Sequence, residues 1–249
     1  MFGRKTFFFI SVFSGVAAAV SGAALLFTVN SSADLVTIRN SLLFEVGEPG
    51  VYDWSSGAAP QGYLLESGDP VPSLVETVTG IVAEPEVSSS TDWNQALRIA
   101  KHLVSDQERT FEPIQSNTVN AYRMITQEGK GYCADYTQVF NSLSLIAGLS
   151  VREWGISFDG YGGDGHAFNE IYEPSIGKWL FIDAFYSFYI SNSSGVPVSV
   201  AELREGISDP ERAGFFIVPI DPSAFQFRPA ERAFEYYRRG IDSLYMVWG

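Results

Sequence analysis

The segment from Gln127 to Phe185 constrains the fold most strongly, because it passes from a helical pattern to a strand pattern within a short length of chain. Gly129 and Gly131 interrupt the chain, and a broad apolar stripe then recurs at helical spacing from Tyr136 to Ala147. Three strand-like segments follow, and the turn at 174–177 predicts that the last two pair as an antiparallel hairpin. These segments are Val151–Ser157, His166–Tyr172 and Lys178–Phe185.

The same segment contains the only cysteine of the chain, one of its two histidines and a suitably placed acid. Cys133 falls at the start of the predicted helix, where the helix dipole favours a thiolate. His166 and Asp183 lie on the two paired strands and can share one face. A thiol, an imidazole and a carboxylate can serve as nucleophile, base and orienting group. A buried, inert cysteine is the alternative interpretation of Cys133.

Three blocks of this segment resemble the signature blocks of the transglutaminase-like superfamily: Gly131–Tyr136, Gly165–Glu170 and Trp179–Asp183. The resemblance implies an α+β, papain-like fold in which a helix with the nucleophile packs on an antiparallel sheet. Two features depart from the family pattern. Phe168 stands where the family often has Trp, and Ala184-Phe185 stands where it often has Pro or a small residue followed by Thr.

The resemblance also implies that the catalytic residues are Cys133, His166 and Asp183, which act without a cofactor or a bound metal. Gln127 resembles in position the oxyanion glutamine of papain-like proteases, and an ordinary glutamine at a helix end is the alternative. We expect Asp135 and Asn169 to support the helix start and the strand rather than to take part in the chemistry.

An uncharged run from Thr6 to Val29 follows Arg4 and Lys5 near the N-terminus. At ~1.5 Å per residue it covers about 36 Å, enough to cross a hydrocarbon core of about 30 Å. The basic flank predicts a cytoplasmic N-terminus. We therefore predict that residues 1–33 form a membrane anchor whose run from Thr6 to Val29 is a single-pass transmembrane helix in the cell membrane, with the catalytic domain on the exported side. A cleaved signal peptide, giving a secreted protein, is the alternative, because Ser31-Ser32-Ala33 supplies small residues at a cleavage site.

Three further regions follow the anchor. Residues 34–90 are acidic and rich in Gly, Pro and Ser, which predicts a spacer with short extended pieces such as Leu74–Val82. Residues 91–190 are predicted to form the catalytic core, with a helix that begins after Thr91. Residues 191–249 carry many aromatic side chains, and we expect them to form an extension packed on the core.

The net charge of −13 argues against nucleic acid as the main partner. The resemblance implies an exported cysteine enzyme that cleaves or transfers an acyl group at a peptide or isopeptide bond, so the expected partner is a protein or peptide substrate. The alternative is a non-enzymatic scaffold or binding component of an envelope or polysaccharide assembly system. Hydrolysis is expected rather than transfer to an amine, because water is the default acceptor unless a site excludes it.

Overall fold

The computed structural model describes residues 72–83, 91–104, 108–114, 116–158 and 164–247. The predicted anchor and all of the predicted spacer except residues 72–83 lie outside these residues, so the predictions for them stay predictions. Within the described part of the chain, no helix is both long and apolar enough to cross a membrane.

Four helices come first in the described chain. Thr91 caps the second of them by accepting a hydrogen bond from the Asn94 amide at 3.2 Å, so the predicted helix start after Thr91 is confirmed. Asn117 caps the third in the same way, through the Asn120 amide. The helices are α3 (Pro72–Val82), α4 (Asp92–Leu103), α5 (Thr118–Glu128) and α6 (Cys133–Ile146).

An antiparallel sheet with the strand order β3-β2-β1-β6 forms the centre of the molecule. The hairpin predicted from the turn at 174–177 is confirmed, because β2 and β3 pair with Asn169 opposite Ile182. The C-terminal β6 returns to pair with β1, and β4 and β5 form a separate two-stranded sheet. The strands are β1 (Val151–Ser157), β2 (Gly165–Glu173), β3 (Lys178–Ile182), β4 (Phe188–Ser191), β5 (Phe216–Pro219) and β6 (Leu244–Val247).

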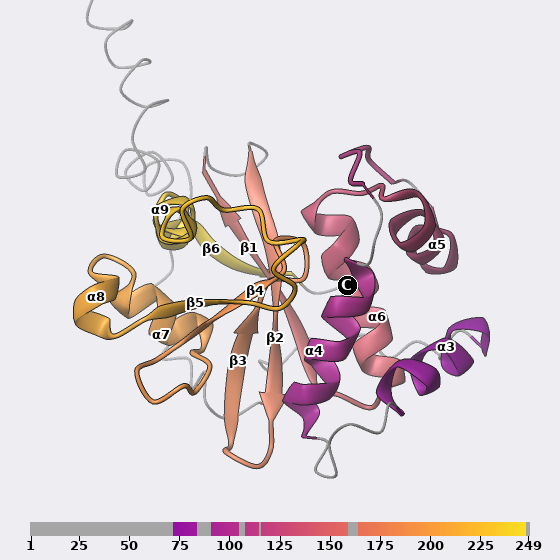
Figure 1. The fold of residues 1–249 in the computed structure, drawn as a ribbon, viewed down its shortest axis with the longest axis horizontal. Coiled ribbons are helices and arrows are strands. Elements are labelled where there is room, and N and C mark those ends of the chain that lie inside the picture. Colours follow the sequence, from indigo (N-terminus) through magenta and orange to yellow (C-terminus); the bar gives the residue numbers. More distant parts are fainter. Residues whose placement is uncertain (1–71, 84–90, 105–107, 115, 159–163, 248–249) are drawn as a thin grey trace, which may run out of the picture.

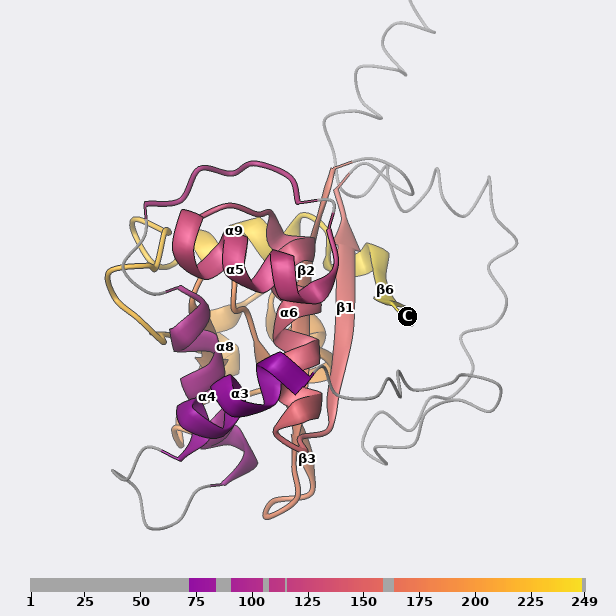
Figure 2. The same ribbon diagram turned by 90° about the vertical axis from the view of Figure 1, so that its right-hand side faces the viewer.

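The two faces of the sheet are covered by different parts of the chain. Figures 1 and 2 show α3 to α6 on one side of the sheet, and the C-terminal helices α7 (Val200–Gly206), α8 (Pro210–Ala213) and α9 (Arg232–Arg238) on the other. Each side has its own apolar core: Ile171 of β2 belongs to the first and Phe168 to the second. Strand alternation therefore directs neighbouring residues of β2 into different layers.

Buried polar side chains join α6 to the sheet. The Asn169 amide nitrogen donates to Asn141 Oδ1 at 2.7 Å, and the Asn141 amide nitrogen donates to Glu153 Oε2 at 3.0 Å. All three residues are buried, and unpaired polar groups in such a place would cost about 1–3 kcal/mol each. The chain of hydrogen bonds thus holds α6 in one position against β1 and β2. The expectation that Asn169 has a supporting role is confirmed.

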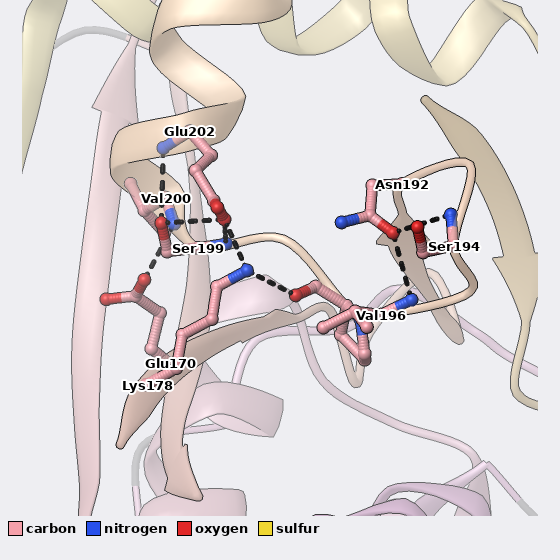
Figure 3. Close-up of polar contacts among 9 residues, drawn as sticks. Glu170, Lys178, Asn192, Ser194, Val196, Ser199, Val200 and Glu202 are labelled. Atoms are coloured by element: carbon pink, nitrogen blue, oxygen red, sulfur yellow. Dashed lines mark hydrogen bonds and ion pairs between the residues drawn. The ribbon is translucent and has the colours of Figure 1, made fainter. Parts of the chain in front are cut away.

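The C-terminal extension is attached to the sheet through Glu170, whose side chain is fully buried. Glu170 accepts a hydrogen bond from the Val200 amide at 2.7 Å, and its other oxygen pairs with Arg152 at 2.6 Å. Figure 3 shows the start of α7 at this point, where Ser199 and Glu202 form a capping box. Lys178 of β3 pairs with Glu202 at 2.7 Å, so the start of α7 contacts both strands of the hairpin.

The prediction of an extended piece at Leu74–Val82 is wrong, because these residues belong to α3. Leu74 and Val78, four residues apart, are both buried and join the core formed with α4 and α6. Pro72 at the first helical position suits a helix start. The β-branched residues of this stretch favour a strand locally, and the burial of one helical face outweighs that preference.

Candidate active site

Cys133 is the first residue of α6, as the glycine break before it predicted. The Tyr132 amide just ahead donates to Asp135 Oδ2 at 2.8 Å. Asp135 therefore supports the helix start, as expected, and its charge is engaged by the backbone. Cys133 is half-buried, so solvent reaches its surroundings. The backbone amides of the first helical turn, which have no partner within the helix, lie next to it.

The approach to Cys133 is held by a backbone ladder with the segment that precedes α5. The Thr110 amide donates to the Gly129 carbonyl at 3.0 Å, and the Gly131 amide donates to the Glu112 carbonyl at 2.8 Å. Gly129 and Gly131 have φ angles of 67° and 115°, in the region that favours glycine. The two glycines predicted to break the chain thus allow the turn that aims α6 at the sheet.

His166 and Asp183 meet as predicted from the paired strands. His166 Nε2 donates to Asp183 Oδ2 at 2.7 Å, and both residues are buried. His166 also hydrogen-bonds the Cys133 side chain. Because Asp183 engages Nε2, the nitrogen available to the sulfur is Nδ1. The structure therefore brings Cys133, His166 and Asp183 together in the order sulfur, imidazole, carboxylate.

The electrostatic surroundings favour an ion pair between thiolate and imidazolium. Burial disfavours the charged imidazole, but the adjacent Asp183 carboxylate and Cys133 outweigh it and raise the pKa of His166 to about 9. Burial also opposes ionisation of the thiol, yet His166 and the Ala167 amide, which hydrogen-bonds the sulfur, lower the pKa of Cys133 below its ordinary value. Each group thus stabilises the charged form of the other.

Three tyrosines that sequence reasoning did not assign to the site surround the imidazole. The rings of Tyr186, Tyr236 and Tyr237 lie 4.9, 5.5 and 5.7 Å from the His166 ring, measured between centroids. Tyr237 also donates its hydroxyl to Asp183 Oδ2 at 2.5 Å. Tyr236 and Tyr237 are neighbours within the aromatic-rich C-terminal extension, but nothing in the nearby sequence says which element they contact.

Arg109 is a second residue that sequence reasoning missed. Its guanidinium lies over the rings of Tyr136 and Phe185, at 5.0 and 5.1 Å from their centroids, and donates to the Phe185 carbonyl. Phe185 in turn lies 6.1 Å from the His166 ring. Arg109 therefore holds Phe185 in place beside His166.

Gln127 lies near the end of α5 with an exposed side chain. None of the contacts in the described part of the chain joins it to Cys133 or His166, so its oxyanion role stays a prediction. Across the described ranges, no cluster of three or more His, Cys, Asp or Glu side chains could hold a metal ion. The other histidine, His102, lies on α4 and hydrogen-bonds the Tyr122 hydroxyl at 2.7 Å, outside the site.

This arrangement has the components of acyl transfer by a thiol. A sulfur with a lowered pKa is a nucleophile near neutral pH. A protonated imidazole beside it can donate to a leaving group, and a buried carboxylate fixes the orientation of the ring.

Comparison with known proteins identifies the central part of the chain. Residues 79–184 match the family model of the Transglutaminase-like superfamily, a stretch that contains Cys133, His166 and Asp183. No curated protein matches the sequence.

Among solved structures, a candidate cysteine protease from Cytophaga hutchinsonii is 23% identical, with 45% of this chain and 37% of that chain covered and a TM-score of 0.35. The periplasmic domain of TgpA from Pseudomonas aeruginosa is 16% identical, with 53% and 46% covered and a TM-score of 0.37. Its complex with ethylmercury gives 18% identity, 46% and 42% coverage and a TM-score of 0.33. The match covers less than half of each of these chains. On the family match, the chain contains a transglutaminase-like domain at residues 79–184.

Proposed function

We propose that this chain is a cysteine enzyme that cleaves or transfers an acyl group at a peptide or isopeptide bond through a thioester on Cys133. The observation that carries the proposal is the hydrogen-bonded series from the half-buried Cys133 thiol through His166 to the buried Asp183 carboxylate. A merely structural cysteine has no need of an imidazole held in this way.

The reaction follows from the charges of the three groups. The Cys133 thiolate attacks the carbonyl carbon of the amide, and the carbonyl oxygen takes up the negative charge of a tetrahedral intermediate. The His166 imidazolium gives its proton to the amide nitrogen, which leaves as an amine while the thioester forms. Neutral His166 then removes a proton from water or from a second amine, which attacks the thioester and releases the thiolate.

The negative oxygen of the intermediate needs hydrogen-bond donors. The backbone amide of Cys133 is suited to this role, because it belongs to the first turn of α6 and has no partner within the helix. The Gln127 side chain would be a second donor if it turned toward the sulfur. The proposal predicts that replacing Gln127 by Ala slows acylation without changing the pKa of His166.

Water is the proposed acceptor, because a thioester is hydrolysed unless a site excludes water. We further propose that the enzyme acts on the exported side of the cell membrane, on a protein or peptide of the envelope. The basic flank and apolar run of the N-terminal 33 residues support this location.

The test uses the fact that Cys133 is the only cysteine. Iodoacetamide is added to the full-length protein at pH 7, and alkylation is followed by intact mass. We expect the folded protein to react at least about tenfold faster than the same chain in urea, because the thiol has a lowered pKa. His166→Ala removes the advantage. His102→Ala, which changes the other histidine, retains it.

A second measurement addresses the reaction itself. Wild-type protein incubated with cell-envelope extract should carry an acyl adduct that hydroxylamine removes, and the Cys133→Ala variant should carry none. The alternative function, a non-enzymatic scaffold for an envelope assembly, predicts alkylation no faster than in the unfolded chain and no hydroxylamine-sensitive adduct.

A further inference from the structure

We propose that Tyr237, on the C-terminal helix α9, is a positioning residue for the His166–Asp183 pair, so that the C-terminal extension completes the active centre. The inference rests on the proposed function, because it assigns a role within the same site. Tyr237 lies well beyond residues 79–184, the part that matches the family, and reaches the site only through the fold of the extension.

The geometry at the carboxylate carries the inference. Asp183 Oδ2 accepts two hydrogen bonds, from His166 Nε2 at 2.7 Å and from the Tyr237 hydroxyl at 2.5 Å. Asp183 Oδ1 accepts a third from the Tyr186 amide at 2.8 Å. With donors on both oxygens the carboxylate cannot rotate freely, and the oxygen that accepts from the imidazole is also held by the Tyr237 hydroxyl.

Tyr237 can act only as a donor here. Burial and the neighbouring Asp183 carboxylate raise its pKa well above the ordinary tyrosine value, so the hydroxyl keeps its proton. A neutral donor holds the carboxylate without cancelling its negative charge, whereas Lys or Arg in the same place would compete with the imidazolium. The charge of Asp183 is thus left to stabilise protonated His166.

The surroundings of the hydrogen bond strengthen it. Tyr237 is fully buried, and its ring stands perpendicular to the imidazole, at 88°. The Tyr236 ring, on the same helix, meets the imidazole at 75°. Tyr237 belongs to the core between the extension and the sheet, and Tyr236 packs against that core. These rings keep water from the carboxylate, and charge interactions are stronger where water is excluded.

The alternation of β2 explains why the extension rather than α6 supplies this residue. His166 lies on the same side of β2 as Phe168, the side that the extension covers, and the two rings stack at 6.0 Å. The body of α6 packs on the other side, through residues such as Ile171, and Cys133 at its start reaches His166 from there. A sheet with α6 alone would leave the back of His166 and Asp183 open to water.

The decisive experiment is Tyr237→Phe in the full-length protein, which keeps the ring and removes the hydroxyl. Alkylation of Cys133 by iodoacetamide at pH 7, expressed per folded molecule from near-UV circular dichroism, should slow by about tenfold. The titration midpoint of His166, followed by NMR of the histidine side chains, should move to lower pH because the carboxylate is held less firmly. A loss of packing would show separately, as a change in the near-UV circular dichroism of the variant.

The matched control is Tyr122→Phe, which removes a tyrosine hydroxyl that hydrogen-bonds the other histidine, His102. It should leave alkylation within about twofold of wild type. If Tyr237→Phe behaves like this control, with an unmoved His166 midpoint, the inference is overturned while the proposed function stands. If wild type itself reacts no faster than the unfolded chain, the proposed function fails and the inference with it.

A double variant covers the case in which Tyr237→Phe folds poorly. Asp183→Asn with Tyr237→Phe removes the buried charge and its donor together, a change that costs less stability than leaving the charge unpaired. If Tyr237 acts through Asp183, the second substitution adds no further loss of alkylation to Asp183→Asn. If the fold-losses of alkylation rate in the two single variants multiply in the double variant, Tyr237 acts independently of Asp183, and the inference is overturned.

Discussion

Replacing Asp183 by Asn tests the charge arrangement of the site with almost no change in shape. The Asp183 carboxylate is the main group that raises the pKa of His166, against the effect of burial, to about 9. The difference between this value and the ordinary 6.5 corresponds to about 3–4 kcal/mol, at about 1.4 kcal/mol per pKa unit. Without the carboxylate, burial dominates, and the pKa of His166 should fall to 6.5 or lower.

The sign of the effect on protonation follows from these values. A histidine is charged below its pKa, so at pH 7.5 a pKa of about 9 keeps about 97% of His166 protonated, and a pKa of 6.5 only about 9%. Asp183→Asn should therefore reduce the imidazolium population about tenfold at this pH. The thiolate of Cys133 loses its counter-ion, and acyl transfer loses its proton donor.

The assay is a titration of the full-length protein between pH 5 and 10, followed by NMR of histidine side chains labelled with 15N. The chain has two histidines, and His102→Ala identifies the signal of His166. Wild type should titrate near pH 9 and Asp183→Asn near or below 6.5. Asp242→Asn, which neutralises an exposed carboxylate of the C-terminal segment, should leave the midpoint unchanged. A wild-type midpoint at 6.5, or an unmoved midpoint in Asp183→Asn, would refute the reasoning.

Three further predictions concern the supports of the site. Leu74→Ala should lower the free energy of unfolding, measured in urea, by about 2–5 kcal/mol, because Leu74 is buried in the core. An unchanged free energy of unfolding would mean that α3 does not pack on the core. Glu170→Gln should cost about 3 kcal/mol, since it removes the negative charge that pairs with the partly buried Arg152, and an unshifted urea midpoint would contradict this. Gly129→Ala should destabilise the protein more than Gly148→Ala does. Both glycines have a positive φ, but of the two only Gly129 lies where a Cβ would collide with a backbone carbonyl, that of Glu108. Equal unfolding midpoints for these two variants would argue against that close approach.

Local signals predicted those elements whose ends depend on nearby residues. The cap at Thr91 and the hairpin turn at 174–177 each involve groups a few residues apart, so the pattern and the structure agree. Leu74–Val82 failed for the opposite reason. Its β-branched residues suit a strand, and only contact with α4 and α6 makes the helix the better way to bury Leu74 and Val78.

The candidate site divides in the same way. The order of Cys133, His166 and Asp183 within recognisable blocks was sufficient to predict that they meet, since the helix start and the hairpin both follow from local patterns. The roles of Tyr237 and Arg109 could not be predicted, because each reaches the site from a separate segment whose packing no short pattern encodes.

The sequence by itself therefore determined which groups can do chemistry, and how the helix and the strands that carry them begin and end. Only the tertiary structure decided what surrounds those groups. The C-terminal extension covers the face of β2 that carries His166, and Tyr237 arrives there through contacts between residues far apart in the chain. The physical reason is the sequence separation of the interacting residues. Helix caps, turns and strand alternation depend on residues a few positions apart, whereas the burial of a charge depends on a distant segment that packs over it.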